Sequence, residues 1–130
     1  MNPPISTLMH RDIVTVTMDA SVAEVERTLS EGRRSWAPVR EGDAILGVVS
    51  LADLARFHAE GRDAASAKAW QLCTYKPVCV HPDDRLADVA RAMAERHIHH
   101  VVVMDERGEP AGVVSSLDIV GLVAAASARD

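Results

Sequence analysis

The residues Gly-Val-Val-Ser-Leu-Ala-Asp-Leu at positions 47–54 recur, with small changes, as Gly-Val-Val-Ser-Ser-Leu-Asp-Ile at positions 112–119. Each copy predicts a buried strand that carries a serine to the start of an amphipathic helix, with an aspartate three residues later. The pairs are Ser50 with Asp53 and Ser115 with Asp118. We therefore expect one strand–helix junction to occur twice, 65 residues apart.

Two interpretations of this junction follow from the chemistry of a helix N-terminus. Its first backbone N–H groups lack intrahelical partners, and the helix dipole adds partial positive charge, so it attracts anions. The serine hydroxyl can hold a phosphate oxygen there, and the carboxylate can accept hydrogen bonds from a sugar diol. Alternatively, the serine and the aspartate form a capping box that satisfies the N–H groups internally. The duplication favours a ligand role, but both interpretations stay open.

The composition excludes several classes of protein. With 130 residues, 48% of them hydrophobic, the chain can bury the core of one compact domain or of two small, tightly joined ones. A net charge of −5 and a low aromatic content of 3% disfavour a nucleic-acid-binding surface. No apolar run approaches the roughly 18 residues of a membrane span, and no basic region precedes an apolar stretch at the start. We expect a cytoplasmic protein.

The hydrophobic periodicity predicts the element order β-α-β-β-α in each half. In the first half a capping box of Ser21 and Glu24 starts a helix that Gly32 ends, and Pro38 favours an edge or entry position for its strand. The alanine-rich stretch 62–72 predicts a helical connector. Strands are expected at residues 13–17, 36–39, 45–49, 78–80, 101–104 and 111–114, and further helices at 86–96 and after Ser50 and Ser115.

The two halves align residue by residue, which indicates an internal duplication. Placing residue 14 over residue 78, with one extra residue in the second hairpin turn, matches identical residues from Val14 and Val78 to Asp53 and Asp118. A unit of this size buries its sheet face only against a second copy. We predict an α+β fold of two β-α-β-β-α repeats packed with pseudo-twofold symmetry.

At this point the chain resembles a tandem pair of cystathionine β-synthase domains, known as CBS domains or a Bateman module. The resemblance covers roughly residues 6–123, and its most specific part is the doubled Gly-h-h-Ser-x-x-Asp-h motif, where h is apolar. The segments Trp36 to Val39 and Ile98 to Val103 add to it. We divide the chain into an N-terminal segment with repeat 1 at residues 1–60, the helical connector at 61–72 and repeat 2 at 73–130.

The resemblance implies a regulatory module that binds an adenosine-containing ligand, such as AMP, ADP, ATP or S-adenosylmethionine, in clefts between the repeats. Asp53 and Asp118 would each hold a ribose diol, and Ser50 and Ser115 would face phosphate. Base contacts would come from two strand starts and from the first strand of each repeat. These residues are Trp36, Ala37, Pro38, Thr15, His100, Val101, Val102 and Cys79.

Within this resemblance the two repeats differ. Val102 replaces the usual proline, and Cys79 stands where repeat 1 has Thr15, so the two clefts are not equivalent. The resemblance also implies a homodimer and an unidentified regulated protein as partners. No catalytic domain is attached and no cofactor is required, so we expect a stand-alone sensor that is not an enzyme. The alternative is a constitutive dimerisation scaffold whose Ser-x-x-Asp motifs are only helix caps.

Other chemistries have weaker support in the sequence. His97, His99 and His100 would place at most two imidazoles on one face of a strand, and a zinc site normally needs three or four ligands. No histidine adjoins either serine motif, which disfavours a hydrolase. Cys73 and Cys79 form no Cys-x-x-Cys motif and are interpreted as reduced, structural thiols, with Cys79 in a buried strand.

Overall fold

The computed structural model describes residues 2–75 and 77–128 and divides the chain into two compact units. The first unit consists of residues Val14–Pro77, and the second combines Met1–Ile13 with Val78–Asp130. Each unit contains one copy of the repeated motif, as the alignment of the two halves predicts. The N-terminal residues, which precede the first repeat in sequence, make their contacts with the second.

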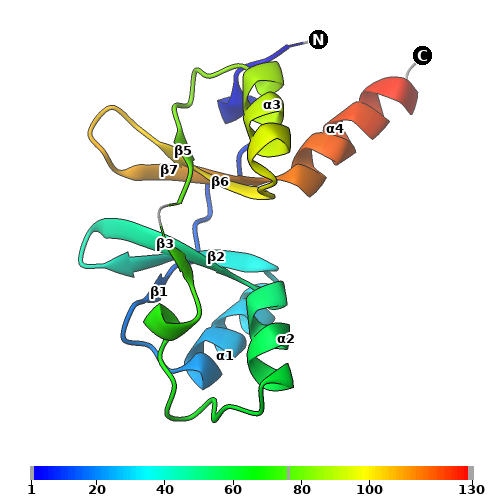
Figure 1. The fold of residues 1–130 in the computed structure, drawn as a ribbon. Helices are drawn as coiled ribbons and strands as arrows, with labels where there is room; N and C mark the ends of the chain where they lie inside the picture. The colour runs from blue at the N-terminus through cyan, green and yellow to red at the C-terminus, as the bar shows by residue number, and fades with distance from the viewer. Residues whose placement is uncertain (1, 76, 129–130) are drawn as a thin grey trace. The chain divides into compact units, whose positions relative to one another are not determined.

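The first unit is a four-stranded sheet with two helices on one face (Figure 1). The strand order is β1-β2-β3-β4; β1 and β2 are parallel, and the other pairs are antiparallel. Val25, Leu29 and Phe57 are buried in its core. The elements are β1 (Val16–Thr17), α1 (Val22–Gly32), β2 (Trp36–Glu41), β3 (Ala44–Ser50), α2 (Leu51–Ala59), the 3-10 turn η2 (Ala69–Gln71) and β4 (Thr74–Tyr75).

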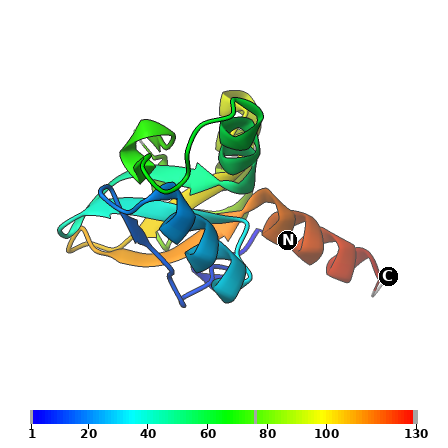
Figure 2. The same ribbon diagram turned by 90° about the horizontal axis from the view of Figure 1, so that it is seen from below.

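The second unit repeats this arrangement around a three-stranded sheet of order β5-β6-β7. Its core contains Ile5 from the N-terminal segment together with Val89, Met93 and Val114. Figure 2 shows α4 leaving the end of β7. The elements are the 3-10 turn η1 (Ile5–Thr7), β5 (Cys79–Val80), α3 (Leu86–Arg96), β6 (His100–Met104), β7 (Pro110–Ser115) and α4 (Ser116–Ala128).

A short covering segment completes each unit with the same backbone hydrogen bonds. In the first unit, the N–H of Val22 donates to the carbonyl of Ala67 at 2.9 Å, and in the second the N–H of Leu86 donates to Pro3 at 2.9 Å. Residues 3–10 therefore occupy in the second unit the place that residues 67–74 occupy in the first. The 3-10 turns η1 and η2 lie at matching positions of these two segments.

The N-termini of α1 and α3 are capped differently. Ser21 caps α1 by accepting the N–H of Glu24 at 3.1 Å, as the sequence predicts. The equivalent residue, Arg85, makes no side-chain cap. Instead, the side-chain oxygen of Asn2 accepts the N–H of Ala87 at 2.8 Å. A residue far away in sequence thus supplies the cap that the second repeat lacks.

The predicted helical connector is wrong: within 61–72, only Ala69–Gln71 form a helical turn, of the 3-10 type. Gly61, at φ +70°, follows the end of α2. The backbone carbonyls of Ala64 and Ala67 accept the N–H groups of Ala23 and Val22 at the start of α1. An α-helix would use those carbonyls internally, so the capping of α1 opposes the local alanine preference for helix.

Of the two positions expected for Pro38, an edge or the entry of its strand, the edge is wrong, because β2 lies between β1 and β3. In the second unit, the equivalent Val102 donates its N–H to the carbonyl of Val78 at 3.0 Å. Proline has no N–H, so this bond has no counterpart at Pro38, and pairing of β1 is confined to Val16 and Thr17. A central strand therefore accommodates proline at the position just before its pairing with β1 begins, at Val39.

The last helix of the first unit, α2, and the last helix of the second unit, α4, differ in how far their apolar side chains are buried. On α2, Leu54 and Phe57 are buried while Arg56 and His58 are exposed, which is the pattern of an amphipathic helix. On α4, Leu117, Val120 and Val123 are 75%, 60% and 50% exposed. Across the described ranges 2–75 and 77–128, no helix has the length and apolar character needed to cross a bilayer.

Candidate functional site

The first candidate site is the junction between β3 and α2, where Ser50 and Asp53 form a reciprocal capping box. The N–H of Ser50 donates to Oδ2 of Asp53 at 2.8 Å, and the N–H of Asp53 donates to Oγ of Ser50 at 3.3 Å. The Ser50 hydroxyl also donates to Oδ2 at 3.1 Å. The other carboxylate oxygen, Oδ1, accepts Nη2 of Arg56 at 2.7 Å. Asp53 is buried, whereas Arg56 is 64% exposed.

The second candidate site, between β7 and α4, repeats this geometry with a different partner for the outer oxygen. The N–H of Ser115 donates to Oδ2 of Asp118 at 2.8 Å, and the N–H of Asp118 donates to Oγ of Ser115 at 3.3 Å. Oδ1 of Asp118 lies 2.7 Å from Nε2 of His10, which comes from the N-terminal segment. The capping interpretation is therefore correct for both junctions, and it leaves the ligand interpretation open.

The environment of Asp118 favours its charged form. Burial alone would raise the pKa of this carboxyl, but the N–H of Ser115 and the neighbouring His10 lower it by more. The result is a pKa below the ordinary value for aspartate. At neutral pH the site therefore presents a carboxylate, which accepts hydrogen bonds and donates none.

Both helix N-termini already use part of their hydrogen-bonding capacity. The N–H of Leu51 donates to the carbonyl of Ser35 at 2.9 Å, and the N–H of Ser116 donates to His99 at 2.8 Å. With the bonds from Asp53 and Asp118, two of the first three N–H groups of each helix have partners. An anion at either junction would thus rely on few backbone donors and needs side-chain partners as well.

The structure brings most of the other predicted site residues to these junctions. In the first unit Trp36 pairs with Ser50 across β2 and β3, and Ala37 pairs with Val49; in the second unit His100 pairs with Ser115. Val101 and Val102 follow His100 in β6, and Cys79 on β5 pairs with Val102. Thr15 precedes β1 and accepts Nε of Arg40 at 3.1 Å, and Pro38 is buried in β2. As ligand contacts, all of these residues remain predictions.

Sequence reasoning missed the two side chains that contact the carboxylates. Arg56 lies one helical turn after Asp53, so its position could have indicated an ion pair. His10 gives no such signal, because 108 residues separate it from Asp118. Only the alignment of the two repeats, in which residue 14 matches residue 78, could have predicted its position. When that alignment is extended back to residues 3–10, Leu8 and Leu72 are the one identical pair.

The histidines and cysteines form no further site. His97 is the left-handed C-cap of α3, directly after the predicted helix 86–96, so it shares no strand face with His99. Within residues 2–75 and 77–128, no three His, Cys, Asp or Glu side chains are grouped to hold a metal ion. Burial raises the pKa of the Cys73 thiol, which disfavours the reactive thiolate. Cys79 is exposed, not buried as expected.

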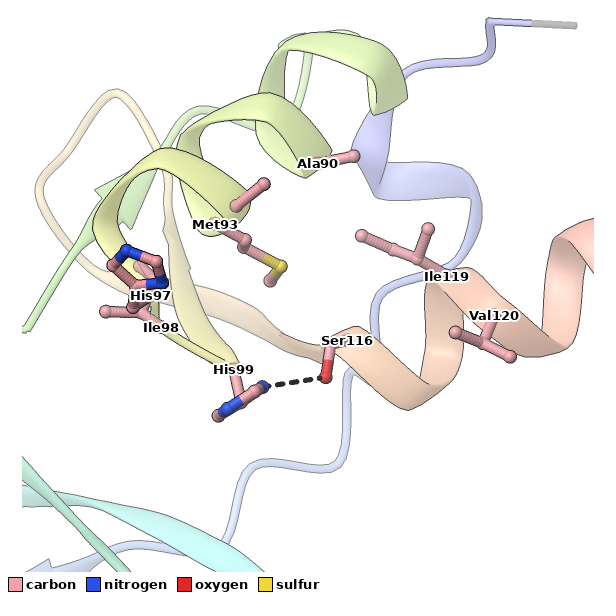
Figure 3. A pocket seen from close by; sticks show the side chains of 9 residues that line it. Ala90, Met93, His97, Ile98, His99, Ser116, Ile119 and Val120 are labelled. Atoms are coloured by element: carbon pink, nitrogen blue, oxygen red, sulfur yellow. Dashed lines mark hydrogen bonds between the residues drawn. The ribbon is translucent and has the colours of Figure 1, made fainter.

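An apolar groove of about 310 Å³ lies between α3 and α4 in the second unit (Figure 3). Met93 and Ile119 point into it from the two helices, and Val120 lies at its edge. At its other end Nδ1 of His99 lies 3.4 Å from Oγ of Ser116. The groove thus lies beside the second junction, and Val120 belongs both to its lining and to the exposed apolar side chains of α4.

Comparison with protein-family models identifies the CBS domain in two segments, residues 5–60 and 69–125. The chain is 23% and 29% identical to two uncharacterized proteins of Methanocaldococcus jannaschii, over 87% and 92% of its length. It spans only 37% and 44% of those relatives. The family match therefore covers nearly all of the chain, and the relatives contain further sequence that it does not match.

Solved structures share the fold. A protein with CBS domains from Burkholderia ambifaria is 28% identical, with a TM-score of 0.82, covering 88% of this chain and 85% of that one. A CBS domain pair in complex with 5′-methylthioadenosine and S-adenosyl-L-methionine is 20% identical with a TM-score of 0.87, covering 96% and 98%. The CBS domain of a bacterial CNNM/CorC-family Mg²⁺ transporter, in complex with ATP, is 24% identical with a TM-score of 0.81, covering 91% and 84%.

Proposed function

The chain belongs to the CBS-domain family, and from this premise we propose that it is a regulatory module that binds an adenosine-containing ligand. The ligand is AMP, ADP, ATP or S-adenosylmethionine, and it binds at the serine–aspartate junctions. The module carries out no chemistry of its own and acts in the cytoplasm on a partner protein. The position of the ligand between the two repeats stays a prediction from the sequence.

One observation carries this proposal: both units present the same carboxylate in the same geometry, with one oxygen left for an exposed partner. Oδ2 of each aspartate is committed to the cap, while Oδ1 contacts a side chain that is more than half exposed to solvent. A ribose diol can replace such a side chain at low cost. Two solved CBS pairs bind adenosine compounds, which supports this ligand class.

Signalling would follow from differential affinity. A ligand that binds one arrangement of the two repeats more tightly than another shifts the population toward the first. The shift can be no larger than the difference in binding free energy between the two arrangements. A partner that recognises one arrangement would then respond to the ligand concentration, and by linkage it would change the ligand affinity by the same factor.

We also propose that the module is a homodimer. The exposed apolar side chains of α4 and the groove beside them supply a ridge and a matching hollow on one unit. A twofold axis would place the ridge of each copy in the groove of the other, which is the self-complementary arrangement that such symmetry requires. Sedimentation of wild type and Leu117→Glu/Val120→Glu tests this: the substitutions should convert a dimer to a monomer.

The alternative, a constitutive scaffold, uses the same fold without a ligand. The capping boxes are consistent with it, because stabilisation of a helix N-terminus is by itself a reason for the geometry that the two junctions share. Ligand binding separates the two functions, because the stability and dimerisation of a scaffold should ignore nucleotides. A metal-dependent sensor would instead respond to a chelator.

The test is thermal unfolding with AMP, ADP, ATP, S-adenosylmethionine and, as a control without adenine, GTP. A ligand at about 100 times its dissociation constant adds roughly 2.7 kcal/mol, which shifts the midpoint by several degrees. The shift should disappear in Asp53→Ala or Asp118→Ala and persist in Asp43→Ala, an exposed hairpin residue. Because the first two variants also lose a cap, each shift is measured against the same variant without ligand. A midpoint that no adenosine compound moves would contradict the proposal.

A further inference from the structure

Each candidate carboxylate has one oxygen that a ligand cannot easily reach and one that a single side chain covers. Oδ2 of Asp53 accepts the N–H and the hydroxyl of Ser50, and Oδ2 of Asp118 accepts the N–H of Ser115. Oδ1 contacts Arg56 at Asp53 and His10 at Asp118, at 2.7 Å in both cases. A ribose hydroxyl that approaches Oδ1 from the side that Arg56 or His10 occupies therefore competes with that side chain.

The two covering side chains come from unrelated positions in the repeat. Arg56 lies on α2, within the same helix as Asp53. At the equivalent place in α4 the chain has Gly121, and α4 contains no lysine or arginine at all. His10 is equivalent instead to Thr74 in β4. The duplication therefore did not produce this feature twice, and each unit covers its carboxylate in its own way.

Arg56 and His10 also differ in where their side chains can go once a ligand has displaced them from the carboxylates. The Arg56 side chain is 64% exposed and keeps its positive charge, so it can turn from Asp53 toward another anion without leaving the site. The backbone of His10 is fixed by two hydrogen bonds with Val113, at 2.9 and 3.0 Å. Only its imidazole can swing away, and no second basic side chain from α4 takes its place.

We propose that Arg56 and His10 compete with the ribose hydroxyls for Asp53 and Asp118 and thereby give the two sites different ligand preferences. The site at Asp53 prefers adenosine ligands with phosphate, because the displaced guanidinium can pair with phosphate oxygens. The site at Asp118 prefers adenosine ligands without phosphate, and its affinity is limited by His10. This inference rests on the proposed function and specifies how that function is divided between the repeats.

The experiment uses full-length variants that retain one site each, with calorimetric titration of adenosine, 2′-deoxyadenosine and ADP. Asp53→Ala retains the site at Asp118, and adding His10→Ala should tighten adenosine binding about two- to fivefold, the range expected for one exposed ion pair. Binding of 2′-deoxyadenosine, which lacks the diol, should not change. A general structural effect of His10→Ala would alter both nucleosides equally, and that result would overturn the inference.

The same titrations at the other site, Asp53, test the role of Arg56. In the Asp118→Ala background, Arg56→Ala should tighten adenosine binding about two- to fivefold and weaken ADP binding by a similar or larger factor. The control is His58→Ala, which removes a histidine of the same helix that contacts Glu26 and should change neither titration. If adenosine binds and the His10 and Arg56 variants leave its affinity unchanged or lower, the competition is disproved while the proposed function stands. If no variant binds any probe, the competition is disproved, and the proposed function is disproved with it when no adenosine compound moves the wild-type unfolding midpoint.

Discussion

The two units make the same backbone hydrogen bonds with different side chains. Ala69 donates its N–H to Ala20 at 2.8 Å in the first unit, and Ile5 donates to Asp84 at 2.7 Å in the second. At these matched positions, one buried side chain is alanine and the other is isoleucine. The duplication thus preserved the main-chain hydrogen bonds, while the cores, the helix caps and the carboxylate partners diverged. The two repeats share a fold and have unequal sites.

The largest expected effect comes from the core residue that the second unit borrows from the N-terminal segment. Ile5 is fully buried, so Ile5→Ala should lower the free energy of unfolding by about 2–4 kcal/mol. Urea denaturation followed by circular dichroism measures this. The control, Thr7→Ala, changes an exposed residue of the same turn and should cost less than about 0.5 kcal/mol. A cost for Ile5→Ala as small as that of the control would contradict the assignment of residues 1–13 to the second unit.

The helix α1 is capped by the adjacent residue Ser21, whereas α3 is capped by Asn2, which is far from it in sequence. Ser21→Ala and Asn2→Ala each remove a side-chain acceptor from a helix N-terminus and should each cost about 1 kcal/mol. Hydrogen exchange separates them: Asn2→Ala should speed exchange of the Ala87 amide, and Ser21→Ala that of the Glu24 amide. Asn2→Asp keeps an acceptor and should retain protection. Equal exchange of Ala87 in wild type and Asn2→Ala would exclude the distant cap.

The third prediction uses the lowered pKa of Asp118. A folded-state pKa below the unfolded one stabilises the protein above the unfolded pKa, and this stability is lost as pH falls through the folded value. Asp118→Asn should therefore be less stable than wild type at pH 7, by up to about 1 kcal/mol, and the difference should shrink below about pH 4. Denaturation from pH 7 to 3.5 tests this, with Asp43→Asn as the exposed control. A difference that grows on acidification would be incompatible with a lowered pKa.

The smallest effect is expected where the two units agree most closely. Arg33 and His97 end α1 and α3 at φ +52° and +54°, in the left-handed region that glycine adopts without strain. Arg33→Gly and His97→Gly should each stabilise by about 0.5 kcal/mol, because relief of strain exceeds the added flexibility of the unfolded chain. Glu31→Gly, inside α1, should instead destabilise by about 1 kcal/mol. Melting curves of the three variants would reveal whether the signs are as stated.

Much of the fold could be predicted because the repeated junctions carry strong local signals. The apolar strands before Ser50 and Ser115, and the polar residues that start the next helices, define the β-α-β-β-α order from local sequence alone. The covering segments, residues 3–10 and 67–74, could not be predicted in this way, since the backbone hydrogen bonds that place them can be made by any residue. For the same reason the alanines at 62–72 indicated a helix that tertiary contacts prevent.

The candidate site was predictable only in part. The serine–aspartate geometry follows from a spacing of three residues at a helix start, which chain geometry determines. The partners of Oδ1 depend on tertiary structure: His10 reaches Asp118 because it pairs with Val113 of β7, and the sequence contains no local sign of this. The exposure of the apolar side chains of α4 could not be predicted from the sequence either, because a helix that is apolar all round is normally buried.

The discontinuity of the second unit has a consequence for synthesis on the ribosome. Residues 14–77 form a contiguous unit whose internal contacts can be made once that part of the chain has emerged. Ile5 must wait for its partner Asp84 and for Val89 and Val114 of the same core, so its contacts have a high sequence separation and form slowly. We expect the first repeat to fold cotranslationally, while the N-terminal segment stays available to chaperones until the second repeat is made.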